Sequence, residues 1–201
     1  KAASSIVLDI STGEVLAMVN QPSADPNNRS LRKAELLKNR AVTDVYEPGS
    51  TFKPLTVAAA LESGNFKPES IIDTTPFELG TKLIGDDRCE GKLDLVMILV
   101  KSCNAGAANL SLAMGPEVFF KTLTKLGISQ ITASGFPGEV RGSLGNYQNW
   151  RPIKQATLSY GYGVSVTPLQ LAKAYAAIAN GGIVNQISIE KIKEKPNGER
   201  A

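Results

Sequence analysis

The apolar residues of this chain fall into short segments with two different periodicities, and this pattern limits the fold classes open to it. Residues 4–10 and 14–20 alternate like strands and are joined by Ser11-Thr12-Gly13, in which Gly13 supplies the positive φ of a hairpin turn. Residues 183–192 alternate in the same way. Between residues 20 and 183, apolar residues recur with the spacing of a helix in five segments: 51–63, 93–101, 105–114, 116–126 and 167–180. The pattern predicts a mixed α/β (α+β) fold with few strands, several buried helices and long loops.

Capping and turn residues mark the ends of these predicted helices. Thr167, Pro168 and Gln170 form a capping-box pattern with proline at the first helical position, so we expect a helix to begin there. Gly64 follows residues 51–63 at the position where glycine commonly terminates a helix. Residues 64–92 and 133–152 are rich in turn-forming residues and are expected to be irregular. The longest apolar run, residues 95–100, is too short to cross a bilayer.

The chain contains no histidine, which excludes Ser-His-Asp and Cys-His catalytic arrangements within it. Its two cysteines, Cys89 and Cys103, are too few for a structural zinc site, and we expect neither a metal nor a cofactor. A single bridge between them is possible outside the cytoplasm, but we expect two free thiols. Because 22 Lys+Arg are interleaved with 19 Asp+Glu, nucleic acid is not an expected partner. Because histidine is absent, acid–base catalysis near neutral pH must use Lys, Tyr or a carboxylate.

A Ser-x-x-Lys pattern is a candidate nucleophile and base, and it occurs three times. Ser30–Lys33 lies in a solvated basic stretch, and Ser188–Lys191 lies in a predicted strand, where residues three apart face opposite sides. Only Ser50 and Lys53 lie at the start of a predicted apolar helix. Proline is tolerated in the first turn of a helix but not in its interior, so Pro54 indicates that this helix begins near Ser50. Burial there would lower the pKa of the lysine towards neutrality, as a general base requires. The alternative is a capping serine with an extended surface lysine.

A second polar group interrupts two apolar helical segments at Ser102-Cys103-Asn104. A hydroxyl and a carboxamide in such a buried break need hydrogen-bonding partners or a function. The same Ser-x-Asn spacing occurs at residues 63–65, where the serine suits a helix C-terminus. A related Tyr-x-Asn occurs in the glycine-rich loop at residues 147–149.

Together these motifs resemble those of the class B penicillin-binding proteins. The resemblance lies in the hairpin pattern Asp-x-x-Thr-Gly-Glu-Val-Leu-Ala-Met, the nucleophile motif Glu-Pro-Gly-Ser-Thr-Phe-Lys-Pro, Lys-Ser-Cys-Asn and Tyr-Gly-Tyr-Gly-x-x-x-Thr-Pro-Leu-Gln-Leu. These strings occupy residues 9–18, 47–54, 101–104 and 160–171, in the family's order. Within the family, the chain most resembles the septal, division-specific transpeptidases of Gram-negative bacteria. The fold implied is that of the serine β-lactamases and penicillin-binding transpeptidases.

The resemblance implies acyl transfer on the D-Ala-D-Ala end of peptidoglycan stem peptides, with an acyl-enzyme that β-lactams also form. Ser50 would be the nucleophile, Lys53 would accept its proton, and Ser102 would relay a proton to the leaving amine. Substrate contacts would come from Asn104, Thr51, Tyr162 and Gly163. The implied partners are stem peptides, β-lactams and division-machinery membrane proteins, at the periplasmic face of the bacterial inner membrane.

One family motif is absent, because no Lys-Thr-Gly or Lys-Ser-Gly occurs in the sequence; the nearest string is Lys121-Thr122-Leu123. The resemblance implies that the strand carrying the absent motif supplies the second N–H of the oxyanion hole. We therefore expect residues 1–201 to form a partial transpeptidase domain, truncated before that motif, without its membrane anchor and with its antiparallel sheet lacking the C-terminal strands. Its expected parts are a hairpin at 4–20, a nucleophile helix at 50–63, a mostly helical subdomain at about 65–180 and a strand at 183–192. Cys103 stands where relatives often have serine, and we assign it no function.

Two other functions remain open at this stage. A serine β-lactamase or penicillin sensor would share the nucleophile, but a β-lactamase needs a carboxylate or modified lysine to activate water; the loop at 133–152 offers only Glu139. Alternatively, the fragment is a non-catalytic structural or binding module, and an uncovered sheet edge would favour self-association. We expect negligible transpeptidation by this fragment alone.

Overall fold

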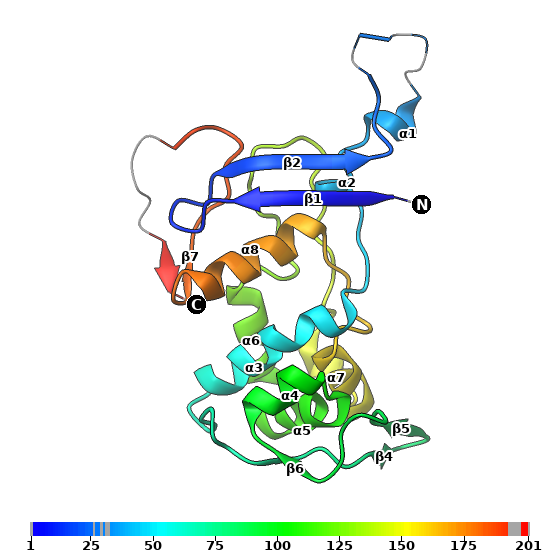
Figure 1. The fold of residues 1–201 in the computed structure, drawn as a ribbon, viewed down its shortest axis with the longest axis vertical. Helices are drawn as coiled ribbons and strands as arrows, with labels where there is room; N and C mark the ends of the chain where they lie inside the picture. Colours follow the sequence, from blue (N-terminus) through cyan, green and yellow to red (C-terminus); the bar gives the residue numbers. More distant parts are fainter. Residues whose placement is uncertain (1, 26, 29, 31–32, 193–197, 201) are drawn as a thin grey trace. The chain divides into compact units, whose positions relative to one another are not determined.

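The computed structural model describes residues 2–25, 27–28, 30, 33–192 and 198–200, in which helices predominate over short strands (Figure 1). The chain divides into two compact units, each made of separate stretches of sequence. Unit 1 comprises Lys1–Tyr46, Leu126–Gly142 and Val166–Ala201, and unit 2 comprises Glu47–Lys125 and Ser143–Ser165. The described residues form four two-stranded antiparallel sheets. The predicted mixed class is confirmed.

Unit 1 contains the N-terminal hairpin, formed by β1 (Ala3–Leu8) and β2 (Val15–Gln21) with Ile6 opposite Met18. The Asp9 carboxylate organises its turn by accepting hydrogen bonds from the backbone N–H groups of Ser11 at 2.8 Å and Thr12 at 3.1 Å. Gly13 has the predicted positive φ, +82°. The hairpin therefore lies where the alternation placed it.

Helix α8 (Pro168–Ala179) packs against β1 and begins with the predicted capping box, in which Thr167 and Gln170 bond reciprocally. Leu169 is fully buried in a cluster with Val42 of α2 (Arg40–Thr43). Because this apolar face meets the hairpin, α8 belongs to unit 1. The predicted helical subdomain at about 65–180 therefore does not coincide with unit 2, because Leu126–Gly142 and the residues from Val166 onward belong to unit 1.

The strand predicted over residues 183–192 is also wrong beyond its first two residues. Strand β7 covers only Ile183–Val184 and pairs with β8 (Glu199–Arg200). Ser188 instead bridges to the hairpin turn, where its carbonyl accepts from the Val15 N–H at 2.8 Å. The alternating pattern reflects the burial of Ile187 in the unit 1 core rather than a continuous strand.

Unit 2 is a helical cluster built around α5 (Asn104–Met114), which packs against α3 (Lys53–Glu62), α6 (Pro116–Lys125) and α7 (Pro152–Ser159). Small residues on α5 permit this close packing. A Cβ on Gly106 would approach Ile98 Cγ1, on α4 (Leu95–Lys101), to 2.8 Å. Buried polar bonds join the helices further, because Thr56 donates to the Ser159 carbonyl at 2.7 Å.

The sequence pattern missed several short elements. In unit 2 these are β3 (Ile72–Asp73) paired with β6 (Lys92–Leu93), β4 (Phe77–Leu79) paired with β5 (Lys82–Ile84), the 3-10 turn η3 (Tyr147–Asn149) and helix α7. In unit 1 they are α1 (Ala34–Leu37) and α2. Most are too short to show a periodicity, and tertiary contacts define them. Among the residues that the structure describes, every helix is too short or too polar to cross a bilayer.

Candidate active site

The candidate nucleophile, Ser50, lies in a 3-10 turn, η2 (Gly49–Phe52), that leads directly into α3. The turn is held by the segment after α7, since the Gly49 N–H donates to the Gly161 carbonyl at 3.1 Å. Gly161 has a φ of +86°, and a Cβ there would lie 2.1 Å from the Gly49 carbonyl oxygen. Only glycine therefore permits this contact. Ser50 itself is exposed at the N-terminal end of α3, where the helix dipole favours negative charge.

Lys53 lies one turn further along and is only 2% exposed. Its ammonium Nζ is 3.2 Å from Ser50 Oγ, 2.9 Å from Ser102 Oγ and 2.5 Å from the Ser102 carbonyl oxygen. Burial lowers the pKa of Lys53 from 10.5 to about 8; the negative charge of Asp86 opposes this shift and the positive charge of Arg88 adds to it. The structure brings Ser50 and Lys53, the pair favoured among the three Ser-x-x-Lys patterns, together with Ser102.

The three oxygens around Lys53 differ in what they can do. A carbonyl only accepts a hydrogen bond, so the Ser102 carbonyl always requires an N–H of Lys53. The two hydroxyls can either accept or donate. When Lys53 loses its proton, its lone pair can therefore face the hydroxyl of Ser50 or of Ser102 while its two remaining N–H groups stay bonded. This arrangement can remove a proton from a serine hydroxyl.

Ser102 occupies a sharp break between two helices. It ends α4 with a left-handed backbone, φ 57° and ψ 51°, a conformation that is uncommon outside glycine and marks a locally strained position. The Cys103 N–H then bonds to the Ile98 carbonyl at 2.9 Å, and α5 begins at Asn104. The break turns the carbonyl and hydroxyl of Ser102 toward Lys53.

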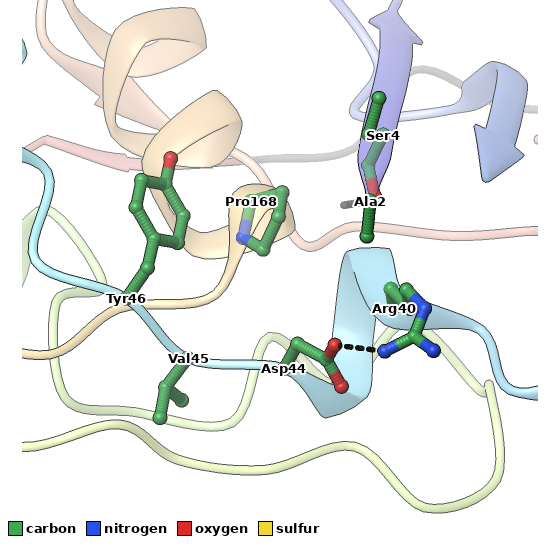
Figure 2. Close-up of a pocket in the computed structure, with 8 residues that line it drawn as sticks. Ala2, Ser4, Arg40, Asp44, Val45, Tyr46 and Pro168 are labelled. Carbon is green, nitrogen blue, oxygen red and sulfur yellow. Dashed lines mark hydrogen bonds and ion pairs between the residues drawn. The ribbon is translucent and has the colours of Figure 1, made fainter. Parts of the chain in front are cut away.

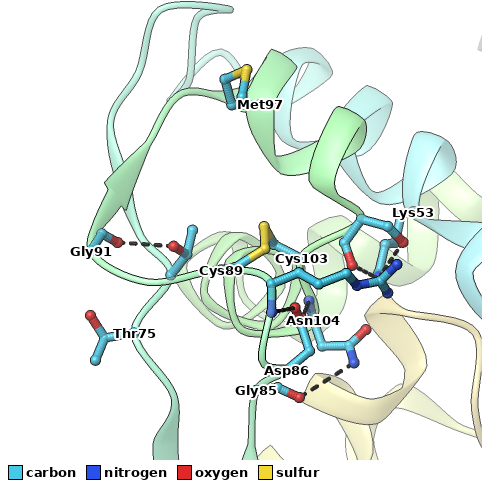
Figure 3. The surroundings of a disulfide bond; sticks show 12 residues. Lys53, Thr75, Gly85, Asp86, Cys89, Gly91, Met97, Cys103 and Asn104 are labelled. Carbon is cyan, nitrogen blue, oxygen red and sulfur yellow. Dashed lines mark hydrogen bonds between the residues drawn. A yellow bond between two sulfur atoms is a disulfide. The ribbon is translucent and has the colours of Figure 1, made fainter.

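The expectation of free thiols was wrong, because Cys89 and Cys103 form a disulfide with their Cα atoms 5.8 Å apart (Figure 3). Both residues are buried, at 3% and 0% exposure. The bond joins the loop before β6 to the middle residue of the Ser-x-Asn turn. Sequence separation alone did not reveal this proximity, which depends on the folding back of residues 72–93.

Asn104 is held by the same loop. Its backbone N–H, one of the first of α5 and without an intrahelical partner, donates to Asp86 Oδ2 at 2.7 Å. Its side-chain amide points to the Gly85 carbonyl at 3.5 Å (Figure 3). No sequence motif pointed to Asp86, whose only signal is an acidic pair, Asp86-Asp87, shortly before a cysteine.

The other candidate substrate-binding residues surround the nucleophile turn. Thr51 is exposed and its hydroxyl donates to the Pro48 carbonyl at 2.7 Å. The Tyr162 side chain is 52% exposed, and its hydroxyl would lie 3.9 Å from a Cβ at Gly49. The Gly163 N–H donates to Glu47 Oε1 at 2.7 Å. Glu47 was not singled out as a site residue, although it begins the nucleophile motif.

The structure gives other motif residues structural roles. Ser63 donates to the Ala60 carbonyl at 2.6 Å, as expected at a helix C-terminus. Lys121 pairs with Glu117 on α6. Glu139, the candidate water-activating carboxylate, lies in unit 1, where its Oε1 accepts the Thr132 N–H at 2.7 Å and the Thr132 hydroxyl.

Unit 1 also holds a pocket of about 270 Å³ that none of the candidate site residues lines (Figure 2). On its wall, Asp44 bridges Lys38 at 2.5 Å and Arg40 at 2.7 Å. The hydrogen bond from Lys38, with a smaller contribution from the hydrogen bond of Arg40, holds the pKa of Asp44 below its usual range. The lining residues are Ala2, Ala3, Ser4, Arg40, Asp44, Val45, Tyr46 and Pro168.

Comparisons with known proteins place these features in context. The profile of the family described as penicillin binding protein transpeptidase domain matches residues 3–201. The chain is 42% identical over 200 residues to the probable peptidoglycan D,D-transpeptidase PenA of Neisseria meningitidis serogroup A and, also at 42%, to the peptidoglycan D,D-transpeptidase FtsI of Escherichia coli K12. In each case the match covers 100% of this chain and 34% of the relative, so the chain spans about a third of these curated relatives.

Solved structures show the same similarity. The transpeptidase domain of penicillin-binding protein 3 from Burkholderia pseudomallei superposes with a TM-score of 0.88 at 40% identity, covering 100% of this chain and 57% of that one. A structure described as a peptidoglycan glycosyltransferase from Burkholderia ambifaria gives a TM-score of 0.86 at 39% identity, covering 100% and 60%.

Proposed function

Because the chain belongs to the penicillin-binding protein transpeptidase domain family, we propose that it carries the acylation site of a serine-type peptidoglycan D,D-transpeptidase. The observation that carries this proposal is the buried amine of Lys53 between the hydroxyls of Ser50 and Ser102. Two relatives support it further by name, the probable peptidoglycan D,D-transpeptidase PenA and the peptidoglycan D,D-transpeptidase FtsI.

In the proposed reaction, Ser50 Oγ attacks the carbonyl carbon between the two terminal D-Ala residues of a stem peptide, and Lys53 takes its proton. The tetrahedral intermediate carries negative charge near the N-terminus of α3, where the Ser50 N–H supplies one oxyanion donor. The carbon–nitrogen bond breaks, and the leaving D-Ala amine receives a proton relayed through Ser102. An amine of a neighbouring stem then attacks the Ser50 ester, which forms the cross-link and frees the serine.

We assign substrate binding to the polar groups around this centre. The Asn104 carboxamide, set at the start of α5, hydrogen-bonds the amide backbone of the donor peptide. The exposed Tyr162 ring and the segment at Gly163 line the approach to Ser50, and Thr51 lies beside it. β-Lactams acylate Ser50 in place of the stem peptide and resist displacement.

The biological setting is part of the proposal. From the motif resemblance to septal transpeptidases, we propose a role in septal cross-linking during division, on the periplasmic face of the bacterial inner membrane, together with membrane proteins of the division machinery. The β-lactamase alternative has less support, because Glu139 Oε1 accepts hydrogen bonds from both the backbone N–H and the hydroxyl of Thr132, which gives this carboxylate a structural role.

Covalent labelling tests the assignment. Incubation of the full-length protein with a fluorescent penicillin should give a stable adduct that resists denaturing electrophoresis, and Ser50→Ala should abolish it. Ser188→Ala is the matched control, since it removes the serine of another Ser-x-x-Lys without touching the proposed site. Labelling of the Ser50→Ala protein would refute the proposed nucleophile, and rapid hydrolysis of the penicillin would favour a β-lactamase.

A further inference from the structure

The loop of residues 85–89 contacts the Ser102-Cys103-Asn104 turn at three places (Figure 3). The Gly85 carbonyl accepts from the Asn104 side chain, Asp86 Oδ2 accepts from the Asn104 backbone, and Cys89 is bonded covalently to Cys103. One short loop thus holds the backbone, the side chain and the neighbour of Asn104.

The loop is itself anchored at both ends. A Cβ at Gly85 would lie 2.6 Å from the Pro76 ring, so the backbone is packed tightly against Pro76. Beyond the other end, the Gly91 carbonyl accepts both the backbone N–H of Thr74 at 2.7 Å and its hydroxyl at 2.9 Å. The loop can therefore hold the turn in place rather than follow its movements.

The turn needs such support because of its backbone geometry. The left-handed conformation at Ser102 persists only where surrounding contacts compensate for its strain. Ser102 is also the residue whose carbonyl and hydroxyl both bond to Lys53. A shift of this turn would change the contacts of two proposed functional groups at once, Ser102 Oγ and the Asn104 carboxamide.

We propose that residues 85–89 form a clamp that positions the Ser-x-Asn turn for acylation, with Asp86 and the Cys89–Cys103 disulfide as its holding points. This inference rests on the proposed function. Asp86 and Cys89 are positioning residues, because they act through Asn104 and Ser102 rather than through contact with substrate. Asp86 has a second effect, since its negative charge opposes the deprotonation of the nearby Lys53 ammonium.

The two effects of Asp86 can be separated by substitution. Asp86→Asn retains an oxygen that can accept from the Asn104 backbone but removes the charge, whereas Asp86→Ala removes both. Acylation of the full-length protein by fluorescent penicillin should slow roughly tenfold in Asp86→Ala, through loss of a charge-assisted hydrogen bond at a helix start. Asp86→Asn should keep most of the rate at high pH and shift the midpoint of the pH–rate profile downward. Glu90→Gln, an exposed neighbour, is the control for charge removal alone.

The disulfide is tested first in the wild type, by reducing the folded protein with a phosphine until both thiols are released, as counted with a thiol reagent. Acylation should fall several-fold and return on reoxidation, while a Cys89→Ser/Cys103→Ser protein should label at the reduced rate in either condition. If that double variant fails to fold, the reduction and reoxidation series of the wild type decides the question.

The outcomes separate the clamp from the function on which it rests. The clamp alone would be overturned if the wild type shows Ser50-dependent labelling while Asp86→Ala, Asp86→Asn and the reduced protein all keep its rate and pH profile. A wild type without Ser50-dependent labelling would overturn the proposed function and the clamp's catalytic role together.

Discussion

At the scale of single residues, the site depends on one cation held almost completely out of water. Lys53 is 2% exposed, and burial is the main cause of its lowered pKa of about 8. An ordinary lysine would be almost fully protonated at neutral pH, whereas a pKa of about 8 leaves about one tenth of the molecules with a neutral amine at pH 7. Burial thus gives Lys53 the lowered pKa that its proposed role as general base requires.

The first prediction is a pH dependence. If neutral Lys53 is the base, the acylation rate should be low below pH 7 and rise through a midpoint near pH 8, because the active form appears as the proton is lost. Stopped-flow or gel-based labelling between pH 6 and 10 measures this profile. Arg88→Gln should move the midpoint upward, since the charge of Arg88 favours the neutral amine. A rate that is flat from pH 6 to 10 would contradict the role of Lys53.

The second prediction concerns Gly161. Replacement by alanine would place a Cβ 2.1 Å from the Gly49 carbonyl oxygen at a φ of +86°, which displaces the turn that carries Ser50. We expect a stability loss of about 3 kcal/mol, from backbone strain plus overpacking, and a large loss of acylation. Thermal denaturation and penicillin labelling measure the two effects.

A matched glycine serves as its control. Gly64 has a similar φ of +74°, but nothing lies within 4 Å of a Cβ built there. Gly64→Ala should therefore cost only about 1 kcal/mol and leave labelling intact. Equal losses in the two variants would show that the contact with Gly49 has no importance.

At the scale of elements, the short helix α4 supports the Ser-x-Asn turn. It has seven residues, and its N-cap, Asp94, accepts from the Met97 N–H at 2.7 Å. A helix this short depends on its cap and its packing rather than on intrinsic propensity. The third prediction is that Asp94→Ala lowers stability by about 1 kcal/mol, while Asp94→Ser, which keeps a capping oxygen, has a smaller effect. Chemical denaturation compares the two, and equal losses would exclude the cap as the cause.

Packing also assigned elements to units in a way that local pattern did not. Helices α3 and α8 both carry clear N-terminal signals, yet α3 belongs to the helical unit and α8 packs on the hairpin. An amphipathic helix is buried against the apolar surface that it meets in the folded chain. For α8 this surface is formed by the hairpin and α2, which lie more than a hundred residues earlier in the sequence.

At the scale of the whole molecule, the 201 residues contain no Lys-Thr-Gly or Lys-Ser-Gly string. The resemblance assigns the second oxyanion donor to that motif, and loss of one such donor costs roughly 10²–10³ in rate. The fourth prediction is that a polypeptide of these 201 residues alone is acylated by penicillin on the order of 100-fold more slowly than a polypeptide that also carries this motif. Comparable rates would show that acylation does not need the motif.

The fifth prediction concerns the exposed side of the N-terminal hairpin. Val7, Leu16 and Val19 are 50%, 58% and 54% exposed, so an apolar surface remains on this unit. Exposed apolar surface beside unpaired strand edges favours association. The same 201-residue polypeptide should therefore self-associate in light scattering, and Val19→Lys should reduce it. A monomer at high micromolar concentration would contradict this expectation.

The sequence by itself determined the mixed fold class, the hairpin and the main helices, and it singled out Ser50, Lys53, Ser102 and Asn104 as candidates. The elements follow from local rules of periodicity, capping and proline in a first helical turn, whereas the roles proposed for the four candidates follow from the family resemblance. Tertiary structure alone decided the burial that lowers the pKa of Lys53, the Cys89–Cys103 bond, the contacts of Asp86 and Glu47, and helix α7 after the glycine-rich loop. Each of these depends on contacts between residues distant in sequence. Such contacts form only when the packed core brings their backbones together, so no local pattern records them.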